Sequence, residues 1–258
     1  MNKLPKVNTY FWIMKLAATT LGETGGDLLS MTLALDYAGS AVVFFVFFLI
    51  SLFAQLASRT FHPLIFWSVI LTTTLTGTAI ADLMSRGTDE DRTLGLGYPA
   101  TTAILLALLL AVLGVWYLSE RSLSVERIRT LRAETFYWVA ILVSNTLGTA
   151  LGDFLADSSG LGFTGANILI TGVLVMVLAA TLFTNIPRVP LFWIAFVLTR
   201  PYGATFGDVL TKSPAEGGTG LGTVGASSIM AAILAIFIVY TTWNRDKVVE
   251  AKAQRESA

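Results

Sequence analysis

The sequence contains no cysteine, a single histidine and little charge. Of its 258 residues, 13% are charged, whereas soluble chains carry about 25%. The lack of cysteine excludes a disulfide-stapled secreted domain. Because 17 Lys and Arg residues balance 17 Asp and Glu residues, the composition also excludes a basic nucleic-acid binder, and no nucleic acid is expected as a partner. What remains is apolar: 54% of the residues are hydrophobic and the mean hydropathy is +0.71, which predicts an all-α polytopic membrane protein.

Apolar stretches of about 20 residues, the length that crosses a bilayer as a helix, recur eight times. We expect spans near 8–29, 37–57, 63–84, 99–119, 135–156, 162–183, 189–211 and 222–243. The even-numbered stretches are almost purely hydrocarbon, whereas the odd-numbered ones contain Thr, Gly and charged residues. The start of the chain is unlike a cleavable signal peptide, because its first apolar stretch itself contains Lys15 and Glu23.

Basic residues are distributed unevenly between the two sides of these spans. Twelve of them fall on the side that holds both termini, and three, Arg86, Arg92 and Lys212, fall on the other. The positive-inside rule therefore predicts cytoplasmic termini. We expect a first transmembrane half at 1–120, a cytoplasmic linker at 121–134, a second transmembrane half at 135–244 and a cytoplasmic tail at 245–258.

The odd-numbered stretches share an ungapped repeat. Each begins with an aromatic residue followed by tryptophan: Trp12, Trp67, Trp138 and Trp193. Ten residues after each tryptophan stands a glycine: Gly22, Gly77, Gly148 and Gly203. Fourteen residues after it stands a small residue: Gly26, Ala81, Gly152 and Gly207. Fifteen residues after it stands an aspartate: Asp27, Asp82, Asp153 and Asp208.

The tryptophan spacings of 55, 71 and 55 residues divide the chain into two halves of two repeats each. Every repeat contains two spans, so all four enter the membrane from the same side, as parallel repeats do. The predicted fold is therefore eight transmembrane helices in four parallel two-helix repeats. The chain resembles a bacterial family of membrane proteins built from a repeat of unknown function. That resemblance implies an eight-helix protein of the inner (plasma) membrane, and it implies no substrate.

On a helix, the repeated residues share one face about 140° wide. The Gly-x-x-x-small pairs are typical of close helix packing, which is the role expected for Gly22, Gly26, Gly77, Gly148, Gly152, Gly203 and Gly207. For at least three of the four tryptophans we expect anchoring at the headgroups, the default for an interfacial indole. Three Gly-Leu-Gly triplets, beginning at Gly95, Gly160 and Gly220, predict turns, with close approach to backbone or ligand as the alternative.

Carboxylates inside membrane segments are candidates for function by default. Each aspartate lies near a helix C-terminus, where the helix dipole disfavours negative charge, and this is repeated four times. The candidate ion-binding residues are Glu23, Asp27, Asp82, Asp153, Asp208, Thr20 and Asn145. The structural alternative is that the aspartates hydrogen-bond to neighbouring helix ends.

Two cations, Lys15 and Arg200, compensate charge in the same segments. A salt bridge to one of the five acids is the expected role of Arg200, with an anion clamp or a counter-charge displaced by a proton or metal as alternatives. We expect Lys15 to extend its amine to the cytoplasmic interface. Pro201 predicts a kink in the seventh helix.

The ligand types favour a hard cation. There is no cysteine, and the one histidine, His62, lies in a loop, whereas carboxylate and hydroxyl oxygens suit Mg²⁺, Ca²⁺, Mn²⁺ or protons. The leading hypothesis is a proton-coupled carrier of a divalent cation such as Mn²⁺, bound by Glu23, Asp27 and Asp153. The alternatives are a structural or accessory membrane protein and a cation channel. No enzymatic motif is present and no cofactor is expected, while the lipid bilayer, a small cation, protons and a second copy of the chain are the expected partners.

Overall fold

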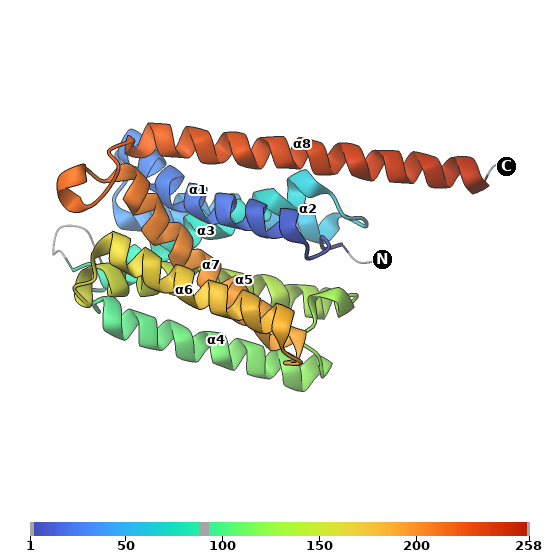
Figure 1. Ribbon diagram of the computed structural model, residues 1–258, viewed down its shortest axis with the longest axis horizontal. Helices are drawn as coiled ribbons and strands as arrows, with labels where there is room; N and C mark the ends of the chain where they lie inside the picture. The colour runs from blue at the N-terminus through green and yellow to red at the C-terminus, as the bar shows by residue number, and fades with distance from the viewer. Residues whose placement is uncertain (1–2, 88–92, 257–258) are drawn as a thin grey trace.

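The structure, a computed structural model, describes residues 3–87 and 93–256. This part of the chain is entirely helical (Figure 1). Its α-helices are α1 (Thr9–Leu33), α2 (Tyr37–Ala57), α3 (Pro63–Ser85), α4 (Tyr98–Glu120), α5 (Leu131–Asp153), α6 (Gly162–Phe183), α7 (Arg188–Thr211) and α8 (Gly222–Glu256). A π-helical turn, Phe154–Ser158, continues α5, and 3-10 turns lie at Val125–Arg127 and Pro214–Glu216.

Six of the described helices are long and apolar enough to cross a membrane: α2, α3, α4, α5, α6 and α8. The expected eight spans are thus supported for six helices. The other two, α1 and α7, have similar lengths of 25 and 24 residues. Both are less apolar than the six and carry charged residues inside the helix, Lys15, Glu23 and Asp27 in α1 and Arg200 and Asp208 in α7.

The odd-numbered helices form an inner four-helix bundle in which α1 packs on α3, α3 on α5, α5 on α7 and α7 on α1. The even-numbered helices lie outside it, and each packs mainly on the odd helix of the following repeat: α2 on α3, α4 on α5 and α6 on α7. The last outer helix, α8, packs on α1, beside which it runs in Figure 1, and so closes the ring. The four repeats are therefore interlocked cyclically.

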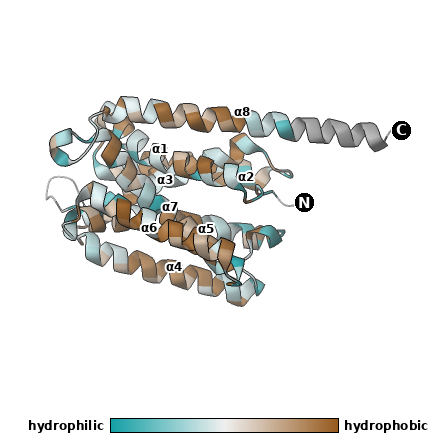
Figure 2. Ribbon diagram, viewed as in Figure 1, coloured by the Kyte–Doolittle hydropathy of each residue, from teal (hydrophilic) through white to brown (hydrophobic). Residues whose placement is uncertain are grey.

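Burial follows this arrangement. In the inner helices α3 and α5, 67% of the most apolar stretch is buried, against 17% to 28% in α2, α4, α6 and α8. Long brown, hydrophobic stretches are visible on the outer helices α4, α6 and α8 in Figure 2. Because exposed hydrocarbon is stable only in an apolar solvent, these surfaces fit contact with lipid chains.

The two ends of the bundle differ. The beginning of α1 and the end of α8 lie at the same end, beyond which α8 extends (Figure 1). We call this the aromatic end, because the Trp residues of the repeat begin the inner helices there, and the opposite end, where the repeated aspartates lie, the acidic end.

At the acidic end the Gly-Leu-Gly triplets lie where the connecting loops lead into α4, α6 and α8. Their six glycines all have positive φ, between 60° and 77°, where a side chain is strained. In two repeats the preceding loop folds back onto the helix that it follows: the Leu96 amide donates to the Met84 carbonyl at 3.0 Å, and the Leu221 amide donates to the Leu210 carbonyl at 3.0 Å. These bonds satisfy carbonyls at the ends of α3 and α7 that would otherwise lack partners.

Candidate functional site

A closed layer of eight aromatic rings begins the inner bundle at the aromatic end. The aromatic residue before each repeat's tryptophan contacts the tryptophan of the next repeat. The ring-centroid distances are 5.7 Å for Phe11–Trp67, 5.6 Å for Phe66–Trp138, 6.4 Å for Tyr137–Trp193 and 5.8 Å for Phe192–Trp12. The fourth contact returns to the first repeat, so the layer is cyclic like the helix packing.

The structure corrects the expected role of the tryptophans. Trp67, Trp138 and Trp193 are 5% exposed or less, so their rings are packed inside the bundle and do not anchor in headgroups. The physical reason is that the face carrying the repeat points toward the bundle axis, and only Trp12 keeps partial exposure. The Trp193 indole donates to the Leu123 carbonyl at 3.0 Å, which ties α7 to the linker between the halves.

Beyond the aromatic layer, one side chain of each inner helix packs against a glycine of the preceding repeat. That side chain stands seven positions after its own tryptophan, and the glycine stands ten positions after the tryptophan of its repeat. The four pairs are Thr74 on Gly22, Asn145 on Gly77, Arg200 on Gly148 and Thr19 on Gly203. A Cβ at any of these glycines would lie closer than 3.0 Å to its neighbour, so each is a point of close helix approach.

The small residue fourteen positions after the tryptophan also lies close to the next inner helix in three of the four repeats. A Cβ at Gly207 would lie 3.2 Å from the Glu23 Cβ, one at Gly152 would lie 3.3 Å from the Ala204 Cβ, and one at Gly26 would lie 3.6 Å from Leu75. The glycines thus bring polar side chains of adjacent repeats to the bundle axis.

Arg200 lies at the centre of this polar cluster with no exposed surface. Its Nη2 lies 2.9 Å from Glu23 Oε2 and also contacts the Thr78 hydroxyl, which itself donates to Glu23 Oε2 at 3.4 Å. Its Nη1 donates to the Thr19 carbonyl at 3.4 Å, whereas its Nε has no partner within the described residues. The expected salt bridge of Arg200 to a membrane acid is therefore present, and α7 stays helical on both sides of the adjacent Pro201.

Lys15 is the second buried cation, and the expectation that it reaches the interface is wrong. Its exposure is 0%, because α1 directs it toward the bundle axis. The Nζ donates to Asn145 Oδ1 at 3.4 Å and lies 4.1 Å from the centroid of the Phe196 ring. Asn145 in turn donates from Nδ2 to the Thr73 hydroxyl at 2.8 Å. Among the side chains that the structure describes, no carboxylate forms an ion pair with Lys15.

At the acidic end the four aspartates divide into two kinds. Asp82 and Asp208 form ion pairs with the basic residue four positions later, at 2.7 Å to Arg86 and 3.8 Å to Lys212. For Asp27 and Asp153 the described part of the chain provides no ion pair. The two aspartates without a basic partner, half-buried Asp27 and buried Asp153, thus come from repeats 1 and 3.

The basic residue of each of these two ion pairs also lies close to an aromatic ring. Arg86 lies 5.4 Å from the Tyr37 ring and donates to its hydroxyl at 3.3 Å, while Lys212 lies 5.7 Å from the Phe163 ring. Tyr37 and Phe163 occupy equivalent places in the two halves. The acidic end therefore has approximate twofold symmetry within the fourfold ring.

The candidate metal ligands are not assembled. Among the described residues, no three His, Cys, Asp or Glu side chains lie together as a metal-binding group, so Glu23, Asp27 and Asp153 do not converge in this conformation. Thr20 is buried on α1 beside Thr19. What the structure brings together is a buried cluster of charged and hydroxyl side chains around Arg200, Glu23 and Thr78.

Two features escaped the sequence interpretation. The basic partners of Asp82 and Asp208 are visible as an Asp-x-x-x-basic spacing in the second and fourth repeats, a signal that could have been used. The other is at the aromatic end, where Lys3 Nζ lies 2.7 Å from Glu134 Oε2. No spacing rule links those two residues, which are distant in sequence.

Comparison with known proteins agrees with the repeat. No curated protein and no solved structure matches the chain. A family model described as Repeat of Unknown Function (DUF347) matches four times, at residues 10–61, 65–122, 136–186 and 191–246. These matches coincide with the four two-helix units of the ring and cover most of the sequence. The chain therefore belongs to this repeat family and carries four copies of the repeat.

Proposed function

We propose that the chain is a secondary transporter that carries a small, hard cation in exchange for protons. The observation that carries the proposal is the set of buried charges on the axis of the inner bundle. Arg200, Lys15 and Glu23 lie there at 0%, 0% and 7% exposure, with four aspartates beyond them. Charges inside a membrane protein cost several kcal/mol each and are kept mainly where ions or protons pass.

The oxygen ligands support a divalent cation such as Mn²⁺. The candidate first contacts are Asp27 and Asp153, which have no ion pair in the described residues, and the inner ligand is Glu23. A cation that binds Glu23 must displace Arg200, which lies 2.9 Å away. We infer that Arg200 acts as a resident counter-charge, which leaves the carboxylate when a cation or proton takes its place.

The two ends of the bundle differ, as is expected of a carrier in one of its conformations. Its aromatic end is closed by the ring layer, while its acidic end bears the carboxylates. Alternating access would then require separation of rings such as Phe192 and Trp12, now 5.8 Å apart, where the fourth repeat meets the first. The proposal places the protein in the bacterial inner membrane with its aromatic end in the cytoplasm, as the distribution of basic residues favours.

The test is ion flux into liposomes that contain the purified protein. Mn²⁺, Ca²⁺ and Mg²⁺ uptake would be measured with and without a pH gradient, for the wild type, Asp153→Asn and the control Asp157→Asn. Asp157 is exposed and lies four residues further along the same helical segment, so the control removes the same charge without touching the axis. We expect saturable, gradient-dependent flux that Asp153→Asn abolishes and Asp157→Asn leaves unchanged.

Equal flux in both variants would refute a carboxylate-dependent carrier. The close packing at the four glycines favours one alternative, a structural or accessory membrane protein. In that case Asp153→Asn would lower the melting temperature in detergent and no ion would be transported by the folded wild type. Flux that does not saturate and ignores the pH gradient would instead indicate a channel.

A further inference from the structure

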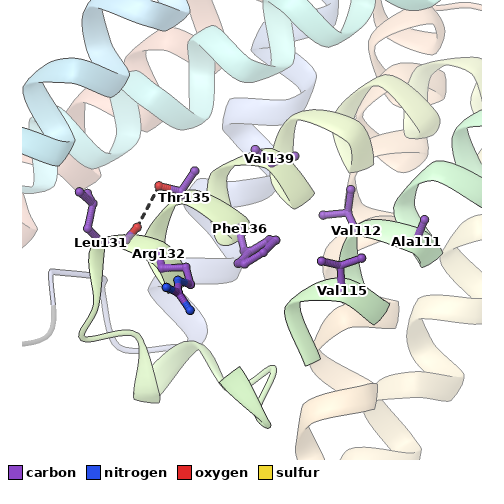
Figure 3. Close-up of a pocket in the computed structure, with 8 residues that line it drawn as sticks. All are labelled: Ala111, Val112, Val115, Leu131, Arg132, Thr135, Phe136 and Val139. Carbon is purple, nitrogen blue, oxygen red and sulfur yellow. Dashed lines mark hydrogen bonds between the residues drawn. The ribbon is translucent and has the colours of Figure 1, made fainter. Parts of the chain in front are cut away.

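A groove on the outside of the ring lies between α4 and α5, near the aromatic end. Its volume is about 600 Å³. Figure 3 shows Phe136 of α5 directed toward Val112 and Val115 of α4, with Arg132 on the other side of Phe136. The remaining lining residues are Ala111, Leu131, Thr135 and Val139. The groove is therefore apolar along its length and has one charged side chain.

The equivalent junction elsewhere in the ring is filled by protein. Phe136 stands two residues before the tryptophan of repeat 3, and Tyr10 holds that place in repeat 1. Tyr10 contacts two aromatic rings of α8, at 6.0 Å to Phe237 and 5.5 Å to Tyr240. At the α4–α5 junction, small aliphatic side chains of α4 face Phe136 instead. The groove exists because α4 supplies less volume there than α8 supplies beside α1.

The charge around the groove points to an anionic occupant. Arg132 is exposed, and its side chain makes no hydrogen bond or ion pair with the side chains that the structure describes. The linker that leads into it, 121–134, contains four arginines and two glutamates. One of these glutamates, Glu134, is already paired with Lys3. A basic segment at the end of membrane-spanning helices attracts anionic headgroups.

We propose that this groove binds one anionic phospholipid, with an acyl chain between α4 and α5 and the phosphate at Arg132. An acyl chain fits the apolar lining, and only a lipid joins such a chain to a negative headgroup at the depth where a helix leaves the membrane. This inference is independent of transport. It requires only that the groove between α4 and α5 opens toward lipid, and both helices are long and apolar enough to cross a membrane.

The test is lipid retention by the full-length protein in detergent, measured by native mass spectrometry. Phosphatidylglycerol and phosphatidylethanolamine with identical acyl chains would be supplied in equal amounts. We expect the wild type to retain phosphatidylglycerol about fivefold better, the ratio that about 1 kcal/mol from one arginine provides. Arg132→Gln should remove this preference, and Ala111→Phe, which fills the groove, should reduce retention of both lipids.

Arg188→Gln is the matched control, because Arg188 is likewise an exposed arginine at the start of an inner helix. It should keep the wild-type preference. The proposal is overturned if Arg132→Gln keeps that preference, if Arg188→Gln loses it equally, or if Ala111→Phe leaves retention unchanged. Displacement of the lipid by millimolar inorganic phosphate would also overturn it, since the site would then recognise free phosphate without the acyl chain.

Discussion

Arg200 and Glu23 are separated by 177 residues in the sequence, yet Arg200 Nη2 lies 2.9 Å from Glu23 Oε2 on the axis of the bundle. The bond joins the last repeat to the first, at the junction where the ring closes. It is also the one ion pair among the described residues in which the cation has no exposed surface. The same ion pair therefore joins the first repeat to the last and neutralises charge in the candidate ion path.

The two partners of this ion pair should not contribute independently to the stability of the protein. Glu23→Gln leaves Arg200 buried without its counter-ion, for which we expect a loss of about 3 kcal/mol or more. The double variant Glu23→Gln with Arg200→Met should lose much less than the sum of the two single variants, because no charge of the pair remains. Thermal unfolding in detergent measures all three, and additive losses would show that the two residues do not interact.

Close packing at the glycines gives a second prediction. In Gly148→Ala the new methyl group meets the side chain of Arg200, and we expect a loss of about 1 to 3 kcal/mol from overpacking. Gly172→Ala is the control: Gly172 lies in the outer helix α6 with no atom within 4 Å of its Cβ position. There the substitution should be neutral or stabilising by up to about 1 kcal/mol. Melting temperatures that fall equally in both would contradict the packing shown.

Cyclic interlocking can be tested by cross-linking, because the chain has no cysteine of its own. The rings of Tyr10 and Tyr240 lie 5.5 Å apart across α1 and α8. In the variant Tyr10→Cys, Tyr240→Cys, a short bismaleimide should therefore join the two ends of the chain. The comparison variant Tyr10→Cys, Phe53→Cys pairs α1 with α2 of its own repeat, where contact is slight, and should react poorly. Efficient cross-linking in the second variant alone would reverse the assignment.

Replacement of Lys15 by an apolar residue should stabilise the protein and abolish ion flux. Removal of its buried charge by Lys15→Met relieves a desolvation cost of several kcal/mol. The hydrogen bond to Asn145 that is lost is worth about 1 kcal/mol. We therefore expect a higher melting temperature together with loss of ion flux. The conservative variant Lys15→Arg retains the charge and should not be stabilised, and a lower melting temperature for Lys15→Met would show that the amine has a structural role.

Much of this fold could be predicted from one sequence because the repeat is ungapped. The eight helices and the position of each glycine and aspartate follow from the distances to Trp12, Trp67, Trp138 and Trp193. The tryptophans were wrongly placed in headgroups because a helix-face argument shows which residues share a face, and not whether the face points inward or outward. Burial of all four motif faces around one axis is a tertiary property, and it also explains the inward position of Lys15.

The residues of the site could be predicted from the sequence, but the pairs that they form could not. Arg200 was expected to neutralise a membrane acid, and the acid it selects, Glu23, depends on which helices are neighbours in the ring. The order of the helices in the sequence suggests that the two helices of one repeat pack on each other. In the structure, each outer helix packs mainly on the inner helix of the next repeat. For that reason neither the contact of α8 with α1 nor the juxtaposition of Lys15 with Asn145 could be deduced from spacing.

The closure of α8 on α1 has a consequence for the ancestry of the chain. A half-length protein with two repeats could form the same ring only as a homodimer, in which every residue on the axis would occur twice. Two copies of Lys15, or two of Arg200, would then face each other across the centre. Lys15, Glu23 and Arg200 each occur once in the ring, so the arrangement of charges on the axis has no counterpart in such a homodimer. An axis with a single copy of each charge requires repeats that differ in sequence.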